Sequence, residues 1–328
     1  MTAPTLSRDP NELLEAAAAG NRVALARLLT MVERGGREAE EVAAIAYRAP
    51  HSYTVGLTGP PGAGKSTMTD RLITVARGGW PAVDADHPAE PLDQVAVLAI
   101  DPSSPFTGGA ILGDRIRMQD HATDPTVFIR SMATRGHLGG LALAVPGAVR
   151  LLGAAGMPVT LIETVGVGQM EVDIVGAADT TVVVVTPGAG DAMQANKAGI
   201  LEIADVFVIN KADRPGLRET RRDLEGMLEL SMFGDWVPPI VQTVAQDGTG
   251  VDELWAEVAR HRAHLIDSGE LGARRQRRLA EELRRVLSAR LALEVEQLAD
   301  GARFAEQVDA LATGQTDPFR AAAALLDR

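Results

Sequence analysis

The sequence predicts an α/β domain in which helices cover a mainly parallel β-sheet. Short apolar runs rich in β-branched residues recur along the central part of the chain, and helix-like segments separate several of them. The runs are residues 53–58, 94–100, 126–130, 158–162, 180–186, 205–210 and 239–242. Residues 181–185 are apolar or β-branched throughout rather than at alternate positions, which favours strands buried on both faces, as in parallel sheets.

The composition is that of a globular protein and excludes several kinds of site. Of the 328 residues, 46% are hydrophobic and 23% are charged, and the net charge of -12 argues against sequence-independent nucleic-acid binding. The absence of cysteine excludes disulfides, thiolate metal sites and cysteine nucleophiles. Residues 1–9 lack the features of a signal peptide, and no apolar run approaches the roughly 18 residues that span a bilayer. We therefore expect a cytoplasmic protein with no membrane partner.

Residues 1–50 are predicted to form a small module of three helices. Asp9, followed by proline and by a glutamate three positions on, has the order of a capping box and should start a helix that ends at Gly20. Asn21 is placed to cap the second helix. We expect this module to pack against a central domain of residues 51–262.

The segment 78–93 is rich in proline, aspartate and alanine and has no helical or strand periodicity. We expect a flexible surface loop between the first helix of the central domain and its second strand. A long insertion is tolerated there because the entropic cost of closing a loop rises slowly with its length.

Residues 263–328 are predicted to form a helical arm. Apolar residues repeat there at helical spacing, at Leu279, Leu283, Val286, Leu287, Leu291 and Leu298. Arginines interspersed among glutamates are expected to form a solvated face: Arg274, Arg275, Arg277, Arg278, Arg284, Arg285 and Arg290. Such an arm can fold back on its own domain or pair with a second copy. We favour a homodimer, because the central domain already has enough elements to close its core.

The first apolar run leads into a glycine-rich loop and then into a helix predicted at residues 67–75. The loop consists of Gly59, Pro60, Pro61, Gly62, Ala63, Gly64, Lys65, Ser66 and Thr67. It matches G-x-x-x-x-G-K-[ST], in which backbone N–H groups and the amino end of the helix bind phosphate oxygens. Lys65 is expected to bridge the β- and γ-phosphates, and the Ser66 hydroxyl to bind Mg²⁺. The sequence therefore predicts a P-loop nucleoside triphosphatase (NTPase) domain.

A second motif, Asn210-Lys211-Ala212-Asp213, ends a buried run. The Asp213 carboxylate can accept hydrogen bonds from the ring N–H and the exocyclic amine of guanine, whereas adenine offers no matching pair of donors. Taken alone, the motif is equally consistent with a helix cap. Because it follows a phosphate loop in the same domain, we assign guanine-nucleotide binding to Asn210, Lys211 and Asp213.

Acidic residues after two other predicted strands are candidates for a metal site. Glu163 directly follows the fourth run, where NTPases hold Mg²⁺, and Gly166 can sense the γ-phosphate through its N–H group. Asp101 and Asp114 follow the second run and are candidate metal ligands, with capping or turn roles as the alternative. Gln169 is either a residue that positions the attacking water or an ordinary exposed glutamine.

The chain is expected to hydrolyse GTP to GDP and phosphate slowly. Pro60 stands where some related ATPases that dimerise face to face carry an extra lysine, and no arginine finger can be named. Lys65, Glu163 and Gln169 remain the candidate catalytic residues. A partner or a loop rearrangement would have to supply the missing transition-state charge, which is the behaviour of a timed switch.

These motifs together resemble the methylmalonyl-CoA mutase-associated GTPases of the MeaB type, also known as ArgK. This family is a metallochaperone-like branch of the signal-recognition and MinD-like GTPases. The matching strings are GPPGAGKST at 59–67, DPSSPFTGGAILGDRIRM at 101–118, RSMATRGHLGGL at 130–141, ETVGVGQ at 163–169, PGAGDAMQANKAGILEIAD at 187–205 and NKAD at 210–213. They cover most of the central domain. The helical start and the arm also look like that family, in which the arm dimerises.

The resemblance implies a GTP-dependent chaperone for an adenosylcobalamin-dependent acyl-CoA mutase, which gates delivery of that cofactor and protects or reactivates the mutase. Adenosylcobalamin would belong to the mutase, and this chain would bind GTP or GDP. Mg²⁺ would be held by Ser66, Asp101, Asp114 and Glu163. The guanine base would be backed by Gln242, Thr243, Val244 and Ala245. A further switch that meets the mutase would include Gly188, Asp191, Gln194 and Lys197.

Three other functions stay open. A metal-insertion GTPase, as in urease or hydrogenase maturation, must hold a metal, and His261 and His264 lie three apart on a predicted helix. A transport-system ATPase or kinase needs an acceptor-binding insertion, and none is evident. A non-enzymatic scaffold is disfavoured by the intact motifs. Val244 stands where family members usually carry serine, so base contact there must rely on backbone N–H groups.

Overall fold

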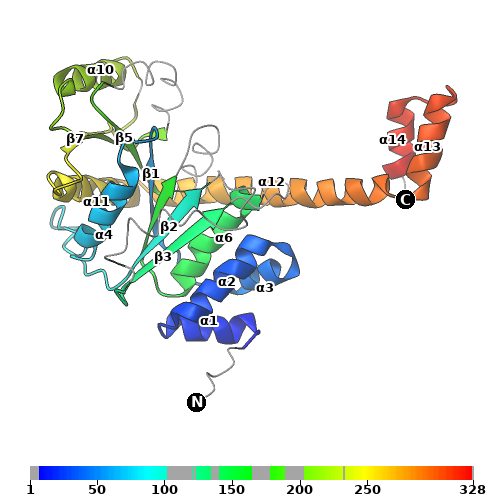
Figure 1. The fold of residues 1–328 in the computed structure, drawn as a ribbon, viewed down its shortest axis with the longest axis horizontal. Coiled ribbons are helices and arrows are strands. Elements are labelled where there is room, and N and C mark those ends of the chain that lie inside the picture. Colours follow the sequence, from blue (N-terminus) through cyan, green and yellow to red (C-terminus); the bar gives the residue numbers. More distant parts are fainter. Residues whose placement is uncertain are drawn as a thin grey trace. The chain divides into compact units, whose positions relative to one another are not determined.

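The computed structural model describes residues 7–101, 121, 123–133, 140–164, 178–188, 203–231 and 233–326. The chain divides into two compact units, Met1–Arg278 and Leu279–Arg328. The first unit contains the β-sheet, and the described part of the second is helical (Figure 1).

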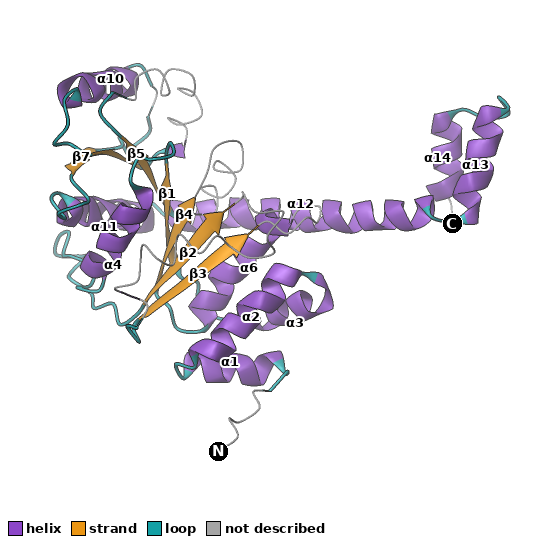
Figure 2. Ribbon diagram, in the orientation of Figure 1, coloured by secondary structure: helices purple, strands orange, loops and turns teal. Residues whose placement is uncertain are grey.

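All seven predicted strands are present, each with bounds close to those predicted (Figure 2). They are β1 (Tyr53–Thr58), β2 (Val95–Asp101), β3 (Val127–Ala133), β4 (Val159–Thr164), β5 (Thr180–Val185), β6 (Val206–Asn210) and β7 (Ile240–Thr243). They form one parallel sheet in the order β3-β2-β4-β1-β5-β6-β7. Since parallel strands end at the same edge of a sheet, the loops after β1, β4, β6 and β7 start close to one another.

Helices cover both faces of this sheet, which explains why the strands are apolar on both sides. α4 (Lys65–Ala76) and α11 (Val251–Asp267) share a core with Val95 and Val97 of β2. α6 (Gly140–Ala154) packs against the opposite face, with Ala96 and Leu98. On that same face α10 (Leu217–Glu229) covers β5 and β6.

The amino-terminal module is present as three helices. They are α1 (Pro10–Ala18), α2 (Arg22–Arg34) and α3 (Gly36–Ala46). The Asp9 side chain accepts a hydrogen bond from the Asn11 N–H at 2.9 Å, and Asn21 caps α2 in the same way. Their apolar residues join the core around α6, and Arg130 of β3 pairs with Glu33 of α2 at 2.6 Å.

Residues 78–93 differ from the flexible surface loop that the sequence predicted. Trp80 is buried and stacks on Trp255 of α11, with ring centroids 4.3 Å apart. The Trp255 indole N–H donates to the Gly79 carbonyl at 2.9 Å, and Trp80 and Glu90 exchange two backbone hydrogen bonds. The predicted place of the loop, between α4 and β2 and largely exposed, is confirmed. Its predicted flexibility was wrong, because the buried Trp80 anchors a segment that has no periodicity of its own.

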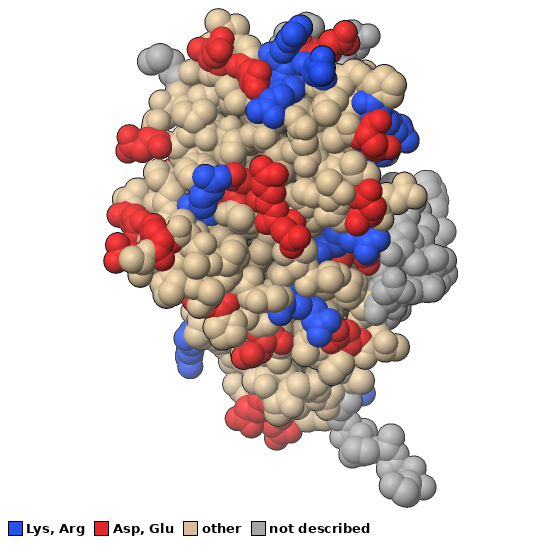
Figure 3. All heavy atoms as spheres, turned by 90° about the vertical axis from the view of Figure 1, so that its left-hand side faces the viewer, with Lys and Arg blue, Asp and Glu red and all other residues tan. Residues whose placement is uncertain are grey.

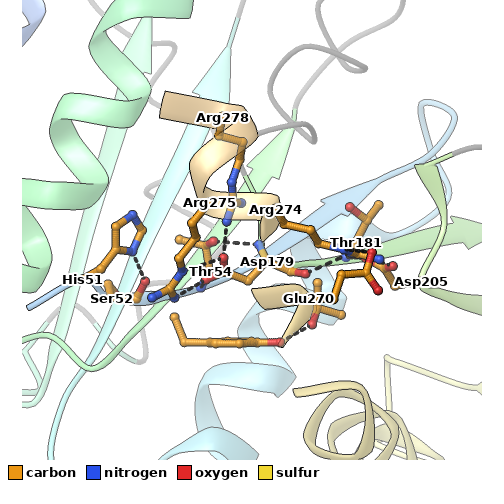
Figure 4. A network of polar contacts seen from close by, with 12 residues as sticks. His51, Ser52, Thr54, Asp179, Thr181, Asp205, Glu270, Arg274, Arg275 and Arg278 are labelled. Carbon is orange, nitrogen blue, oxygen red and sulfur yellow. Dashed lines mark hydrogen bonds and ion pairs between the residues drawn. The ribbon is translucent and has the colours of Figure 1, made fainter. Parts of the chain in front are cut away.

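Three of the arginines predicted to be solvated instead bind buried carboxylates, at the start of α12 (Glu270–Ala299) (Figure 4). Arg275 Nη2 lies 2.7 Å from Asp179 Oδ2, and Arg278 pairs with the same carboxylate. Arg274 Nη1 lies 2.9 Å from Asp205 Oδ1. The two aspartates directly precede β5 and β6. We call these five residues the arginine clasp.

The second unit consists of the rest of α12 with α13 (Ala302–Ala312) and α14 (Pro318–Leu326). Seven large aliphatic side chains of its α12 segment are 38–68% exposed: Leu279, Leu283, Val286, Leu287, Leu291, Leu293 and Val295. The apolar repeat predicted from the sequence is therefore largely exposed in the described part of this unit.

Candidate functional site

The loop after β1 is shaped by glycines. Gly59, Gly62 and Gly64 have φ values of 141°, 76° and 94°, a region that favours glycine. A Cβ atom on Gly59 would lie 2.0 Å from the carbonyl oxygen of Val184 in β5. The loop therefore packs directly on the neighbouring strand and delivers the chain to the first turn of α4, whose positive dipole end faces the loop.

Lys65 is the first residue of α4, and its side chain lies back over the loop. Its Nζ atom donates to the Gly59 carbonyl at 2.5 Å and to the Pro60 carbonyl at 3.3 Å. Ala63 is buried, whereas the outer positions of the loop, Pro61 and Gly62, are exposed, as is Thr67 on α4. The ammonium group is thus held against the backbone at the start of the loop, where its charge favours binding of an anion.

Ser66 and Glu163 meet at the carboxyl edge of the sheet. The Ser66 hydroxyl donates to Glu163 Oε1 at 2.5 Å, and Glu163 is 1% exposed. Glu163 pairs with Ala99 of β2, two residues before Asp101 ends that strand. A hydroxyl and a carboxylate are hard oxygen donors of the kind that Mg²⁺ prefers.

Asn210 links the phosphate loop to the loop that follows β7. Its Nδ2 atom donates to the Ala63 carbonyl at 2.8 Å. Its Oδ1 atom accepts hydrogen bonds from the Thr243 hydroxyl at 3.2 Å and from the Ala245 N–H at 3.0 Å. A Cβ atom on Gly64 would lie 2.4 Å from Asn210 Nδ2, so the glycine permits this close approach.

Lys211 and Asp213 follow Asn210 at the same edge. Lys211 has a left-handed backbone with φ of 60°, and its Nζ atom donates to the Gly62 carbonyl at 2.6 Å. The Ala212 N–H donates to the Thr243 carbonyl at 3.0 Å, which fixes the start of the turn. Asp213 is exposed on that turn. A strained non-glycine residue of this kind is typical of functional sites.

Gln242 and Thr243 end β7, and Val244 and Ala245 begin the loop that follows it. We call residues 244–247 the base loop. Thr243 and Ala245 are buried, and Val244 and Gln242 are half-buried. Arg71 of α4, which the sequence did not single out, donates to the carbonyls of Ala245 at 3.2 Å and Gln246 at 2.8 Å. Contacts to backbone carbonyls leave no pattern in a sequence.

Several predicted site residues lie outside the described residues: Asp114, Gly166, Gln169, Asp191, Gln194 and Lys197. Gly188 ends the described turn after β5, with φ of 80°. The structure thus brings together Lys65, Ser66, Glu163 and Asn210, with Asp101 on the adjacent strand.

Of the two histidines considered as a metal site, His261 and His264, the first is bound within the protein core. His261 is fully buried, with Nδ1 2.8 Å from the Thr180 hydroxyl and Nε2 3.2 Å from Asp205 Oδ1. Its ring therefore belongs to the polar network around the arginine clasp. Within the described ranges, no three histidine or acidic side chains gather as a metal cluster would require.

On the face of the molecule in Figure 3, Asp and Glu side chains are interspersed with Lys and Arg. Positive charge is therefore not gathered into one broad patch over the described part of this face. No helix in the described ranges is long and apolar enough to cross a membrane.

Relatives with known names share most of this chain. A Pyrococcus abyssi protein is 48% identical over 321 residues, which cover 96% of this chain and 95% of its own length. The Escherichia coli GTPase ArgK is 35% identical over 277 residues, 81% of this chain and 80% of its own. The mouse mitochondrial methylmalonic aciduria type A homolog is 34% identical, covering 78% of this chain and 64% of its own.

A solved structure and a family model agree with these relatives. The crystal structure of an LAO/AO transport system kinase is similar over 98% of both chains, with a TM-score of 0.69 and 25% identity. The model of the methylmalonyl-CoA mutase-associated GTPase MeaB matches residues 25–299. The site geometry, the relatives and this match lead to one conclusion: the chain belongs to the MeaB family of GTPases.

Proposed function

We propose that this GTPase is a timed switch for an adenosylcobalamin-dependent acyl-CoA mutase, with methylmalonyl-CoA mutase as its client. It would gate delivery of the cofactor and protect or reactivate the mutase. The name of the family, mutase-associated GTPase, supports this proposal, as does a relative named for methylmalonic aciduria. Adenosylcobalamin would be bound by the mutase.

The observation that carries the nucleotide assignment is the link made by Asn210. One side chain contacts both the phosphate loop, at Ala63, and the base loop, at Ala245. A nucleotide bound with its phosphates at Lys65 and its base near Asp213 would span these two loops. Guanine is favoured because Asp213 can accept from its N1–H and its amine.

The same edge suits a divalent cation. Ser66 and Glu163 would hold Mg²⁺ from the phosphate loop and from β4, with Asp101 and Asp114 as the remaining protein ligands. Bound Mg²⁺ neutralises charge that develops on the phosphate oxygens during transfer. Lys65 would bind the β- and γ-phosphates, Gly166 would sense the γ-phosphate, and Gln169 would orient the attacking water.

The remaining assignments concern the chain as a whole. We propose a helical module at residues 1–50, the GTPase domain at 51–262 and a dimerisation arm at 263–328. The protein would be a cytoplasmic homodimer. The surface that meets the mutase would include Gly188, Asp191, Gln194 and Lys197.

The proposal is tested by GTP hydrolysis with the purified chain, alone and with methylmalonyl-CoA mutase, using ATP as the control nucleotide. We expect slow GTP turnover that the mutase accelerates and no turnover of ATP. If the mutase leaves the rate unchanged, the client assignment fails and the nucleotide chemistry stands.

Asp213→Ala tests the base assignment in the same assay. We expect GTP affinity to fall by about tenfold or more, because two hydrogen bonds to a carboxylate are lost. Asp223→Ala, which removes an exposed carboxylate on α10, is the matched control and should leave affinity unchanged. Equal affinities of the two variants would remove Asp213 from the site.

A further inference from the structure

Arg71 joins two loops that a nucleotide would bridge. It lies in the second turn of α4, the helix that starts in the phosphate loop. Its guanidinium group donates from Nε to the Ala245 carbonyl and from Nη2 to the Gln246 carbonyl, at 3.2 and 2.8 Å. Through Arg71, α4 therefore binds two consecutive peptide groups of the base loop.

The backbone of the base loop is what a purine would contact there. Val244 and Ala245 carry no polar side-chain atoms, and their N–H groups already donate to the Thr249 carbonyl and to Asn210 Oδ1. The main-chain donor that the base loop would offer to a base is therefore the N–H of the next residue, Gln246. Guanine presents an acceptor, O6, beside the donors that Asp213 would bind. The position and orientation of this backbone thus decide whether O6 finds a donor.

The base loop is held from two sides. Asn210 accepts from the Ala245 N–H at 3.0 Å, and Arg71 donates to the carbonyl of the same residue. Internal bonds complete the turn, with the Val244 N–H donating to the Thr249 carbonyl at 3.0 Å and the Gly248 N–H donating to the Val244 carbonyl at 3.0 Å. Asn210 is also bonded to Ala63 of the phosphate loop, and Arg71 lies on the helix that follows this loop. Both residues therefore fix the position of the base loop relative to the phosphate loop.

Arginine suits this task better than lysine would. Its planar fork can donate to two acceptors in fixed directions, whereas a lysine ammonium is a compact point charge. A cation bonded to a carbonyl also polarises that peptide group and strengthens the N–H at its other end as a donor. For the Ala245 carbonyl, the N–H of the same peptide group belongs to Gln246.

We propose that Arg71 is a positioning residue that sets the base loop for recognition of the purine O6 atom. It acts through the backbone of residues 245 and 246 and touches no nucleotide atom itself. The inference rests on the proposed placement of guanine between Asp213 and the base loop.

The test compares three diphosphates with the full-length chain. GDP has O6 and the exocyclic amine, and inosine diphosphate keeps O6 without the amine. 2-Aminopurine riboside diphosphate keeps the amine but lacks both O6 and the N1–H, so each variant is compared with the wild type on the same diphosphate. We expect Arg71→Ala to lower the affinity for GDP and for inosine diphosphate by about tenfold, the equivalent of one charged hydrogen bond. The affinity for the analogue without O6 should fall by less than about twofold. Affinities are measured by titration calorimetry or by competition with a fluorescent nucleotide.

Two further arginine variants separate positioning from general damage. Arg77→Ala removes an arginine at the end of the same helix that pairs with Asp124 at 2.6 Å, and it should bind all three diphosphates as the wild type does. Arg71→Lys keeps the charge but not the fork, so its affinity for GDP should lie between those of Arg71→Ala and the wild type. Melting temperatures of the three variants are recorded alongside.

The outcomes separate this inference from the function on which it rests. An equal loss for all three diphosphates, or no loss for any, would overturn the role of Arg71. Asp213→Asn should lower the affinity for GDP whether or not Arg71 positions the base loop. If Asp213→Asn binds GDP normally, the proposed guanine site is wrong, whereas a weakened Asp213→Asn with a normal Arg71→Ala refutes the positioning role alone.

Discussion

At the scale of single residues, substitution of Gly59 and of Gly62 distinguishes two reasons why the phosphate loop needs glycine. One is the strain of a positive φ, and the other is a steric clash between a Cβ atom and a neighbouring strand. Both have positive φ, but a Cβ atom would lie 2.0 Å from the Val184 carbonyl oxygen at Gly59 and would meet nothing within 4 Å at Gly62. We expect Gly59→Ala to lower the free energy of unfolding by more than about 2 kcal/mol, and Gly62→Ala by about 1 kcal/mol.

Urea denaturation and GDP affinity check this pair. Gly59→Ala should also lose nucleotide binding, because the loop must move away from β5 to relieve the clash. If both variants lose the same stability, contact with Val184 is not what requires glycine at position 59.

The residues of the site differ in how far the sequence reveals them. Lys65, Ser66 and Asn210 belong to short motifs, because phosphate and base recognition require particular side chains at fixed spacing. Arg71 lies 174 residues from its partner Ala245 and binds only backbone carbonyls, which every residue has. Its role could be found only once the fold had brought α4 and the base loop together.

At the scale of elements, the arginine clasp joins the start of α12 to the sheet. Burial raises the pKa of the Asp179 carboxyl, but hydrogen bonds and charge from Arg275 and Arg278 outweigh burial and lower that pKa to about 2. A native pKa below the unfolded value of about 4 stabilises the fold above pH 4, by about 3 kcal/mol. This stability should be lost as the pH falls from 4 towards 2.

Asp179→Asn tests the clasp. It leaves two arginines without their carboxylate, and we expect it to lower the free energy of unfolding at pH 7 by about 3 kcal/mol or more. It should also remove the part of the acid dependence that Asp179 contributes, as measured by urea unfolding from pH 2 to 6. Asp223→Asn is the exposed control, and a matching loss from that variant would show that the clasp contributes nothing special.

The elements themselves were largely predictable, and the exceptions share a cause. Short apolar runs identified all seven strands, because most of these strands are buried on both faces, whereas β7, at the edge of the sheet, is fully buried only at alternate residues. The flexibility of residues 78–93 and the solvation of the clasp arginines were misjudged, because Trp80 and Arg275 contact residues that are distant in sequence. Local composition predicts the average exposure of a segment, but it does not show whether one of its residues contacts a distant part of the chain.

At the scale of the whole molecule, the described residues of the second unit form no core of their own. Among its described residues only Ala321 is buried, while the aliphatic repeat of α12 is exposed. A unit of this size cannot bury enough apolar surface alone, so a second copy that covers the repeat would stabilise it. The same surface could instead be covered by the client, and the two cases predict different behaviour of the isolated chain.

The doubly substituted Leu283→Glu, Leu287→Glu variant distinguishes them. If the repeat pairs two copies, the wild type should sediment as a dimer and this variant as a monomer, because two buried carboxylates on each chain oppose association. Intrinsic GTP turnover per chain should not change, since all the residues of the described site lie within Met1–Arg278. Ser288→Glu adds one such carboxylate at an exposed position next to the repeat and should remain dimeric. A wild type that sediments as a monomer would exclude pairing through the arm and leave the client as the partner for this face.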